Sequence, residues 1–152
     1  MALRIFAFLI INFAALGIGG YLMGNGASST WYASLEKAPW TPPGWSFGAA
    51  WTTIMLCFSL YMPIALGATK NKTKLLNLFT IQWILNTAWS PVFFRYHQTE
   101  LALVIIILLT ALILYFLVHY LPRLRAKSLF ILPYFAWLLI ATSLNAYIVA
   151  QN

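Results

Sequence analysis

The sequence predicts an all-α membrane protein whose five helices cross a bilayer as one bundle. Hydrophobic residues make up 62% of the chain and charged residues 7%, whereas about a quarter of the residues of a soluble domain are charged. A soluble fold of 152 residues has too small an interior to shield so many apolar side chains from water. Aromatic residues reach 17%, including seven tryptophans, and tryptophan favours membrane–water interfaces.

Five apolar segments carry this prediction, each close to the roughly 20 residues that a membrane-spanning helix needs. They are Leu3–Met23, Trp45–Leu66, Leu75–Phe94, Leu101–Tyr120 and Leu129–Ala150. No second apolar core or linker divides them, so we expect residues 1–152 to form a single transmembrane domain.

The connection between the first two segments, Gly24–Gly44, is far longer than the 2–8 residues that usually join helices in bundles. It starts with glycine and serine, continues in an expected short helix at Trp31–Glu36, and returns through Pro42 and Pro43, which favour extended backbone. We therefore expect a long structured loop between helices 1 and 2. Its aromatic side chains suit either an interfacial belt or a lid folded over a pocket.

Polar and aromatic residues share helix faces in the second, third and fifth segments. The stripes are Phe47, Trp51 and Met55; Gln82, Asn86 and Trp89; and Pro133, Trp137, Ala141 and Asn145. Such stripes are typical of a cavity wall, but amides also join helices by hydrogen bonds without any ligand. Both interpretations stay open for each residue. The fourth segment has only Thr110 near its middle, so we expect it to be scaffold.

Prolines interrupt three segments, at Pro63, Pro91 and Pro133. Each is expected to remove one backbone donor, and either bends its helix or helps to hold a cavity open.

The loop charges predict the orientation in the membrane. If the helices alternate, one side collects seven basic residues and no acidic ones, while Glu36, Lys37, Arg95 and Glu100 cancel on the other side. Basic loops stay in the cytoplasm, so we expect the N-terminus inside and the C-terminus outside, in a bacterial cytoplasmic membrane. The net charge of +7 is explained by these loops, and no nucleic-acid partner is expected.

Residues for conventional catalysis or metal binding are scarce. Glu36 and Glu100 are the only acidic residues and Cys57 is the only cysteine, so paired carboxylates and cysteine-based metal sites are excluded. His97 and His119 are expected on opposite sides of the membrane. We expect no metal site, and the sequence contains no residue that can be assigned a conventional catalytic role.

Three sequence blocks resemble the TspO/MBR family, the tryptophan-rich sensory proteins related to the mitochondrial translocator protein. They are WYASLEKAPWTPPGWSFGAAW at Trp31–Trp51, QWILNTAWSPVFF at Gln82–Phe94 and LPYFAWLLIATSLN at Leu132–Asn145. The order of the blocks, the five segments and the long first connection extend the resemblance to the whole chain.

The resemblance implies a homodimeric five-helix bundle that contacts membrane lipid and binds porphyrin, haem or drug-like aromatic ligands, with no further cofactor required. The ligand-binding residues that carry over are Tyr32, Pro42, Trp51, Asn86, Trp89, Trp137, Ala141 and Leu144. Mammalian members also have a cholesterol-recognition pattern near the end of helix 5. Here Ala146 and Ala150 replace its aromatic and basic residues, so we do not expect cholesterol to be a native ligand.

The expected function is a membrane tetrapyrrole-binding protein that senses, transports or disposes of porphyrins. Two alternatives remain from the same resemblance. One is an enzyme that degrades porphyrin in light, with Trp51 and Trp137 as redox-active side chains. The other is a small-molecule transporter, although five helices show no inverted repeat.

Overall fold

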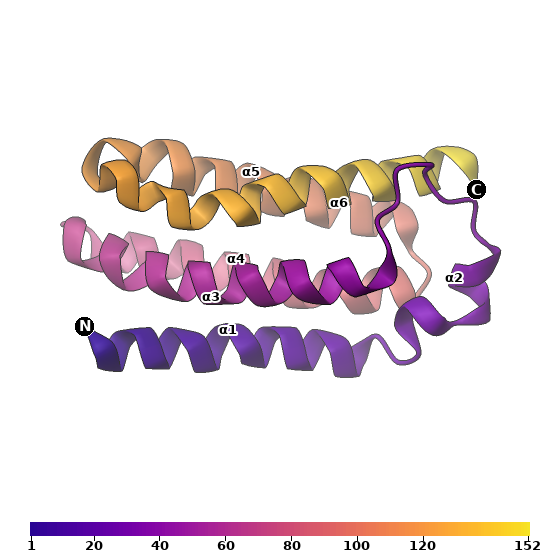
Figure 1. The fold of residues 1–152 in the computed structure, drawn as a ribbon, viewed down its shortest axis with the longest axis horizontal. Coiled ribbons are helices and arrows are strands. Elements are labelled where there is room, and N and C mark those ends of the chain that lie inside the picture. The colour runs from indigo at the N-terminus through magenta and orange to yellow at the C-terminus, as the bar shows by residue number, and fades with distance from the viewer.

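The protein is an all-helical bundle in a computed structural model that describes every residue from 1 to 152. Its five long helices are α1 (Ala2–Leu22), α3 (Gly44–Ala68), α4 (Lys72–Phe94), α5 (Thr99–Leu124) and α6 (Leu132–Gln151). They lie side by side along the long axis of the molecule (Figure 1). The count agrees with the five helices expected from the apolar segments.

Long apolar helices identify the chain as an integral membrane protein. By length and composition, three helical stretches are suited to cross a bilayer, Ala2–Ser28, Gly44–Ala68 and Thr99–Gln151, and the last contains both α5 and α6. Large apolar side chains also cover the outside of the bundle, including Phe6, Ile84 and Leu108. Side chains of this kind require contact with lipid rather than water.

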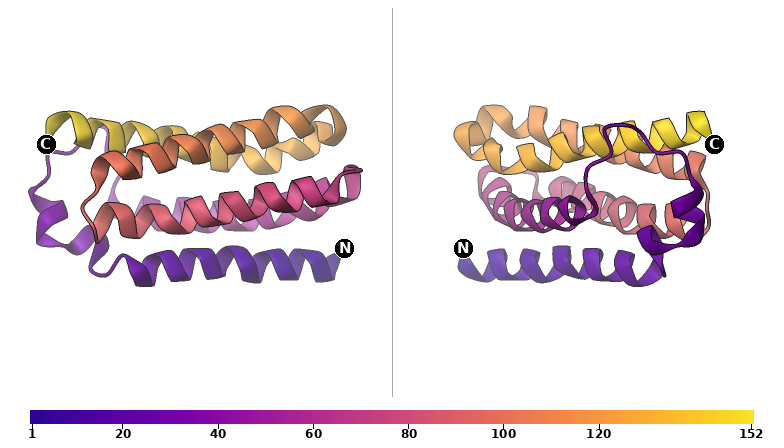
Figure 2. Two further views of the ribbon diagram at one scale, coloured as in Figure 1. Left: turned by 180° about the vertical axis from the view of Figure 1, so that it is seen from behind. Right: turned by 45° about the vertical axis from the view of Figure 1, so that its right-hand side comes forward.

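The five helices form a ring. α1 packs between α3 and α4, α5 packs between α4 and α6, and α6 closes the ring against α3. Figure 2 shows from two further sides that α1 borders the bundle at the edge away from α5 and α6. As a result α4 and α6 are not direct neighbours, and they face each other across the interior of the ring.

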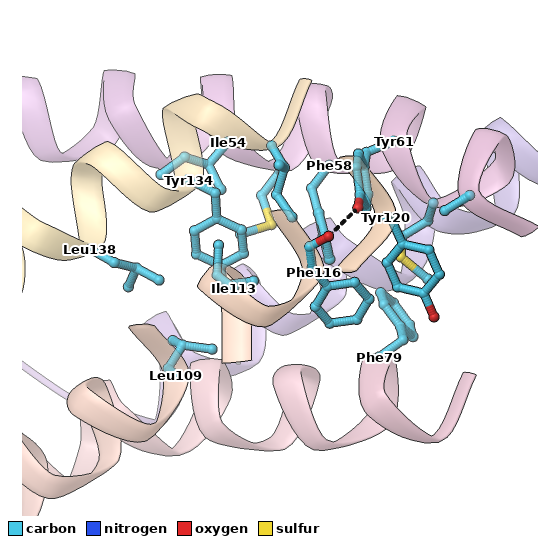
Figure 3. Packing of buried hydrophobic residues seen from close by; sticks show 14 of the residues in the cluster. Ile54, Phe58, Tyr61, Phe79, Leu109, Ile113, Phe116, Tyr120, Tyr134 and Leu138 are labelled. Atoms are coloured by element: carbon cyan, nitrogen blue, oxygen red, sulfur yellow. Dashed lines mark hydrogen bonds between the residues drawn. The ribbon is translucent and has the colours of Figure 1, made fainter. Parts of the chain in front are cut away.

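The bundle has two distinct ends. We call the end that carries α2 and the C-terminus the α2 end, and the opposite end, which carries Met1, the N-terminal end (Figure 1). The N-terminal half of the interior is filled by aromatic side chains around Phe58, which is fully buried (Figure 3). Tyr61 donates its hydroxyl to the Phe116 carbonyl at 3.0 Å, and thus satisfies the one polar group it brings into the core.

The fifth predicted helix, which corresponds to α6, begins later than expected. The expected segment 129–150 starts inside a 3₁₀ helix, η2 (Arg125–Ile131), and α6 proper begins only at Leu132. Pro133 therefore occupies the first turn of α6, where a backbone N–H has no intrahelical acceptor to lose. Pro63 and Pro91 do lie inside helices, as expected.

The chain between α1 and α3 contains two short helices, η1 (Gly26–Ser28) and α2 (Thr30–Ser34). Ser29 caps α2 by accepting a hydrogen bond from the Tyr32 backbone N–H at 3.1 Å. After α2 the chain reaches α6 before it turns back to the start of α3 (Figure 1). Below, residues 23–43 are called the α1–α3 connection.

Candidate functional site

Two hydrogen bonds cross the ring between α4 and α6. Gln82 donates from its amide nitrogen to the Tyr134 hydroxyl at 2.8 Å, and Trp89 donates from Nε1 to Asn145 Oδ1 at 3.2 Å. Both residue numbers increase from the first bond to the second, so α4 and α6 run parallel. Asn145 also donates to the Thr99 carbonyl at 2.9 Å, which fixes the second bond to the start of α5.

The space between these two bonds holds most of the expected ligand-binding residues. Asn86 lies one turn beyond Gln82 on α4, and Trp137 lies one turn beyond Tyr134 on α6. α3 contributes Phe47 and Trp51 to the same hydrophobic cluster. We call the following set the interior site: Phe47, Trp51, Asn86, Trp89, Trp137, Ala141 and Leu144.

Aromatic rings dominate the walls of the interior site. Phe47 contacts Trp137 edge-on with ring centroids 5.2 Å apart, and Trp51 contacts Tyr134 edge-on at 6.1 Å. Edge-to-face contacts at such distances are favourable, about 0.5–1.5 kcal/mol beyond area burial. Phe47 and Tyr134 were not among the predicted ligand-binding residues. Phe47 could have been found from its four-residue spacing to Trp51. Tyr134 could have been found from its position three residues before Trp137, on the same helix face.

Two polar atoms in the interior site have no hydrogen-bond partner. They are the acceptor Oδ1 of Asn86 and the donor Nε1 of Trp137, and Oε1 of neighbouring Gln82 is also unpartnered. A buried polar atom without a partner costs about 1–3 kcal/mol. An unpaired donor and an unpaired acceptor, placed between the same two cross-ring bonds, can receive the polar groups of a bound molecule.

Four residues of the interior site keep a small exposed fraction. Asn86 is 9% exposed, and Trp137, Ala141 and Leu144 are each 8% exposed, although all four face inward. In the N-terminal half Phe58, Tyr61 and Met62 are 0% exposed. Two of these slightly exposed residues, Asn86 and Trp137, also carry the unpartnered polar atoms.

The α1–α3 connection is held over the α2 end by contacts to three other parts of the chain. Trp40 donates from Nε1 to Ser143 Oγ at 3.1 Å and packs edge-on against Tyr147. The Glu36 N–H donates to Asn152 Oδ1 at 2.9 Å. Trp31 stacks on His97 between α4 and α5, with ring centroids 3.9 Å apart. The side chain of His97 is therefore engaged with Trp31.

Tyr32 and Pro42 are placed differently from the other predicted residues. Tyr32 packs edge-on against Phe93 and Phe94 at 6.2 and 5.2 Å, in a small second cluster at the α2 end. Burial raises the pKa of its phenol further above physiological pH, at which an ordinary tyrosine is already neutral. Pro42 is half-buried and precedes α3. Trp89 packs against both clusters and connects Tyr32 to the interior site.

Other surfaces of the bundle do not coincide with the predicted residues. A cleft of about 350 Å³ lies between α1 and α4 on the outside of the ring, lined by Leu22, Trp83, Thr87 and Arg95 among others. No group of three or more histidine, cysteine or acidic side chains comes together that could hold a metal ion. The aromatic and amide chemistry of the interior site is thus suited to binding a flat apolar molecule.

Comparison with known proteins finds relatives over the whole chain. The model of the TspO/MBR family matches residues 7–151. Protein CrtK of Rhodobacter capsulatus is 31% identical, with 95% of this chain and 91% of CrtK covered. The tryptophan-rich protein TspO of Archaeoglobus fulgidus is 34% identical, with 94% of each chain covered. The human translocator protein is 34% identical, with 84% of this chain and 78% of the human protein covered.

Proposed function

Because the chain belongs to the TspO/MBR family, we propose that it is an integral membrane protein that binds a tetrapyrrole and acts in porphyrin sensing, transport or disposal. The ligand, porphyrin or haem, would occupy the interior site. No further cofactor is required for binding.

The unpartnered pair Asn86 Oδ1 and Trp137 Nε1 is the observation that carries this proposal. A porphyrin or haem carries two carboxyl groups on an otherwise apolar disc: a carboxyl oxygen can accept from Trp137 Nε1, and a protonated carboxyl O–H can donate to Asn86 Oδ1. Trp51, Trp89 and Trp137 supply indole faces on which such a disc can stack.

The α1–α3 connection serves in this proposal as a long structured lid over the α2 end, with Tyr32 and Pro42 closing the site from above. Its hydrogen bonds to Ser143 and Asn152 are few and exposed, so they can break without disturbing the ring, and opening would also separate Tyr32 from Phe93 and Phe94. Segments held by a few exposed hydrogen bonds open at low free-energy cost. A ligand would then enter from the α2 end.

A second function, light-dependent porphyrin degradation, is favoured by one specific arrangement. Trp51 contacts Tyr134, and Tyr134 accepts a hydrogen bond from Gln82, so an oxidisable indole lies beside a hydrogen-bonded phenol. In this alternative Trp51 and Trp137 would act as redox-active residues. Transport of a small molecule through the same site is the third candidate.

Fluorescence titration of the purified protein with protoporphyrin and with haem tests the proposal. We expect saturable quenching of tryptophan fluorescence in the dark, weakened by Asn86→Leu. Trp83→Phe is the matched control, because Trp83 lies on α4 outside the ring and its Nε1 already donates to the Ile11 carbonyl at 2.9 Å. Loss of the porphyrin spectrum under illumination would favour the enzyme. Absence of saturation with both ligands would refute tetrapyrrole binding.

The family and the charge pattern support three further proposals. The chain forms homodimers, its N-terminus is cytoplasmic, and cholesterol is not a native ligand. For the last of these, Ala146 and Ala150 stand where the sterol pattern needs an aromatic and a basic side chain. Tyr147 between them packs against Trp40 of the lid.

A further inference from the structure

A second candidate site lies at the N-terminal end of the bundle, away from the interior site. A cleft of about 430 Å³ opens there between the α3–α4 connection and the end of α5. Its polar lining consists chiefly of Thr69, Lys70, Asn71, Lys74, His119 and Arg123. We call it the basic cleft.

The basic side chains converge from two elements. His119 and Arg123 stand four residues apart, on one face of the last turns of α5. Lys74 comes from the first turn of α4, and its Nζ lies 5.3 Å from the centroid of the Tyr115 ring on the same α5 face. Tyr115 in turn stacks on His119, with centroids 4.9 Å apart. These aromatic contacts orient Lys74 and His119 along one wall.

Carboxylates that could neutralise this cluster are far away. Glu100 lies in the first turn of α5, and 19 residues of helix separate it from His119, roughly 28 Å at 1.5 Å per residue. Glu36 is part of the α1–α3 connection, and both Glu36 and the C-terminus lie at the α2 end. The Debye length is about 10 Å at 0.1 M salt, so these negative charges are screened from the basic cleft.

The start of α4 adds to the positive field. Asn71, which lines the cleft, caps the helix by accepting from the Lys74 N–H at 2.9 Å, so the first turn of α4 begins at the cleft. The positive end of a helix dipole favours an anion. Concave shape, three cationic side chains and a helix terminus thus act on the same space.

We propose that the basic cleft binds a phosphate-bearing anion, supplied either by the headgroup of an anionic lipid in the adjacent leaflet or by soluble phosphate. Lys74 and Arg123 grip the phosphate from α4 and α5, and Lys70 contributes from the connection between α3 and α4. The site is independent of the tetrapyrrole proposal, since it shares no residue with the interior site.

The test uses the purified full-length chain in two arms. In the first, inorganic phosphate is titrated by calorimetry into protein held in phosphatidylcholine nanodiscs at constant ionic strength. In the second, nanodiscs contain phosphatidylglycerol in place of part of the phosphatidylcholine, and retained lipid is counted by native mass spectrometry. Saturation in the first arm identifies soluble phosphate, and retained phosphatidylglycerol in the second identifies the lipid headgroup.

Charge-neutralising variants separate a built site from general attraction. Lys74→Gln and Arg123→Gln should each weaken binding about fivefold, the effect of roughly one cationic contact at a membrane surface. Lys72→Gln is the matched control, because it removes the same charge two residues away, from a side chain outside the cleft. All three residues are exposed, so folding should be preserved. No saturable binding in either arm, or an equal loss in Lys72→Gln, would overturn the proposal.

Discussion

Replacement of Trp137 by phenylalanine should separate ligand binding from packing. The change removes the Nε1 donor, which has no partner in the structure, and keeps an aromatic ring against Phe47. If that donor is kept unpaired for a ligand, its removal should weaken protoporphyrin binding without reducing the free energy of unfolding. If Trp137 only packs the bundle, the replacement should instead reduce the free energy of unfolding and leave protoporphyrin binding unchanged.

The magnitude follows from two opposing effects. Removing an unpartnered buried N–H recovers about 1–3 kcal/mol. The smaller ring leaves a cavity of about 40 Å³, which costs about 1 kcal/mol at about 24 cal/mol per Å³. The free energy of unfolding should therefore stay unchanged or rise by up to about 2 kcal/mol. Loss of one hydrogen bond to the ligand should weaken affinity about two- to tenfold.

Trp83→Phe supplies the comparison within the same protein. Its indole donates to the Ile11 carbonyl at 2.9 Å and joins α4 to α1, so its loss should lower stability by about 0.5–1.5 kcal/mol. Protoporphyrin affinity should not change. Thermal unfolding in detergent, followed by circular dichroism, and fluorescence titration measure the two quantities for each variant.

The result that would refute this reasoning is a common pattern in both variants. If Trp137→Phe loses as much stability as Trp83→Phe and keeps wild-type affinity, then the unpaired donor of Trp137 has no role in binding. The interior site would then have to be withdrawn as a ligand site, because Asn86 and Trp137 are the two residues that give it polar character.

Three further predictions concern other parts of the molecule. Tyr134→Phe leaves the Gln82 amide without its partner and should destabilise the protein by about 1–3 kcal/mol. The control Tyr21→Phe, at an 85% exposed side chain, should have no effect. Equal stabilities of the two variants would contradict the role of the cross-ring bond. A reporter that is active only outside the cytoplasm, fused after Asn152, should be active, and silence in well-expressed protein would reverse the proposed orientation. A sterol probe should bind no better than other lipids, and the double variant Ala146→Tyr with Ala150→Arg should strengthen its binding; saturable wild-type binding that the double variant leaves unchanged would be evidence against the sterol argument.

Some features of the site were predictable and others were not. Asn86 and Trp137 could be proposed from the sequence because an amide and an indole stand out at helical spacing in an apolar segment, and the structure places both in the interior of the ring. Tyr134 was missed because tyrosine is common in membrane helices and gives no special signal. The prediction that Pro133 interrupts a helix was wrong for a local reason. The apolar residues at the end of η2 continue directly into α6, so the sequence does not show where α6 begins.

α5 illustrates why apolar sequence leaves inward faces undetermined. Its buried residues Ile106, Leu109, Ile113 and Phe116 follow helical spacing, yet the exposed positions between them are equally apolar, as at Leu108 and Leu114. A water-soluble helix reveals its core face by contrast with polar residues, and lipid removes that contrast.

The sequence by itself determined the membrane class, the number of long helices and the family, because these depend on composition, segment length and ordered motifs. The tertiary structure decided which helices and which side chains face each other. The ring order places α4 across from α6, which pairs Gln82 with Tyr134 and leaves Asn86 and Trp137 unpaired between two cross-ring bonds. It also brings Lys74 beside the basic face of α5. Both outcomes depend on contacts between residues distant in sequence, and helix periodicity carries no information about such contacts.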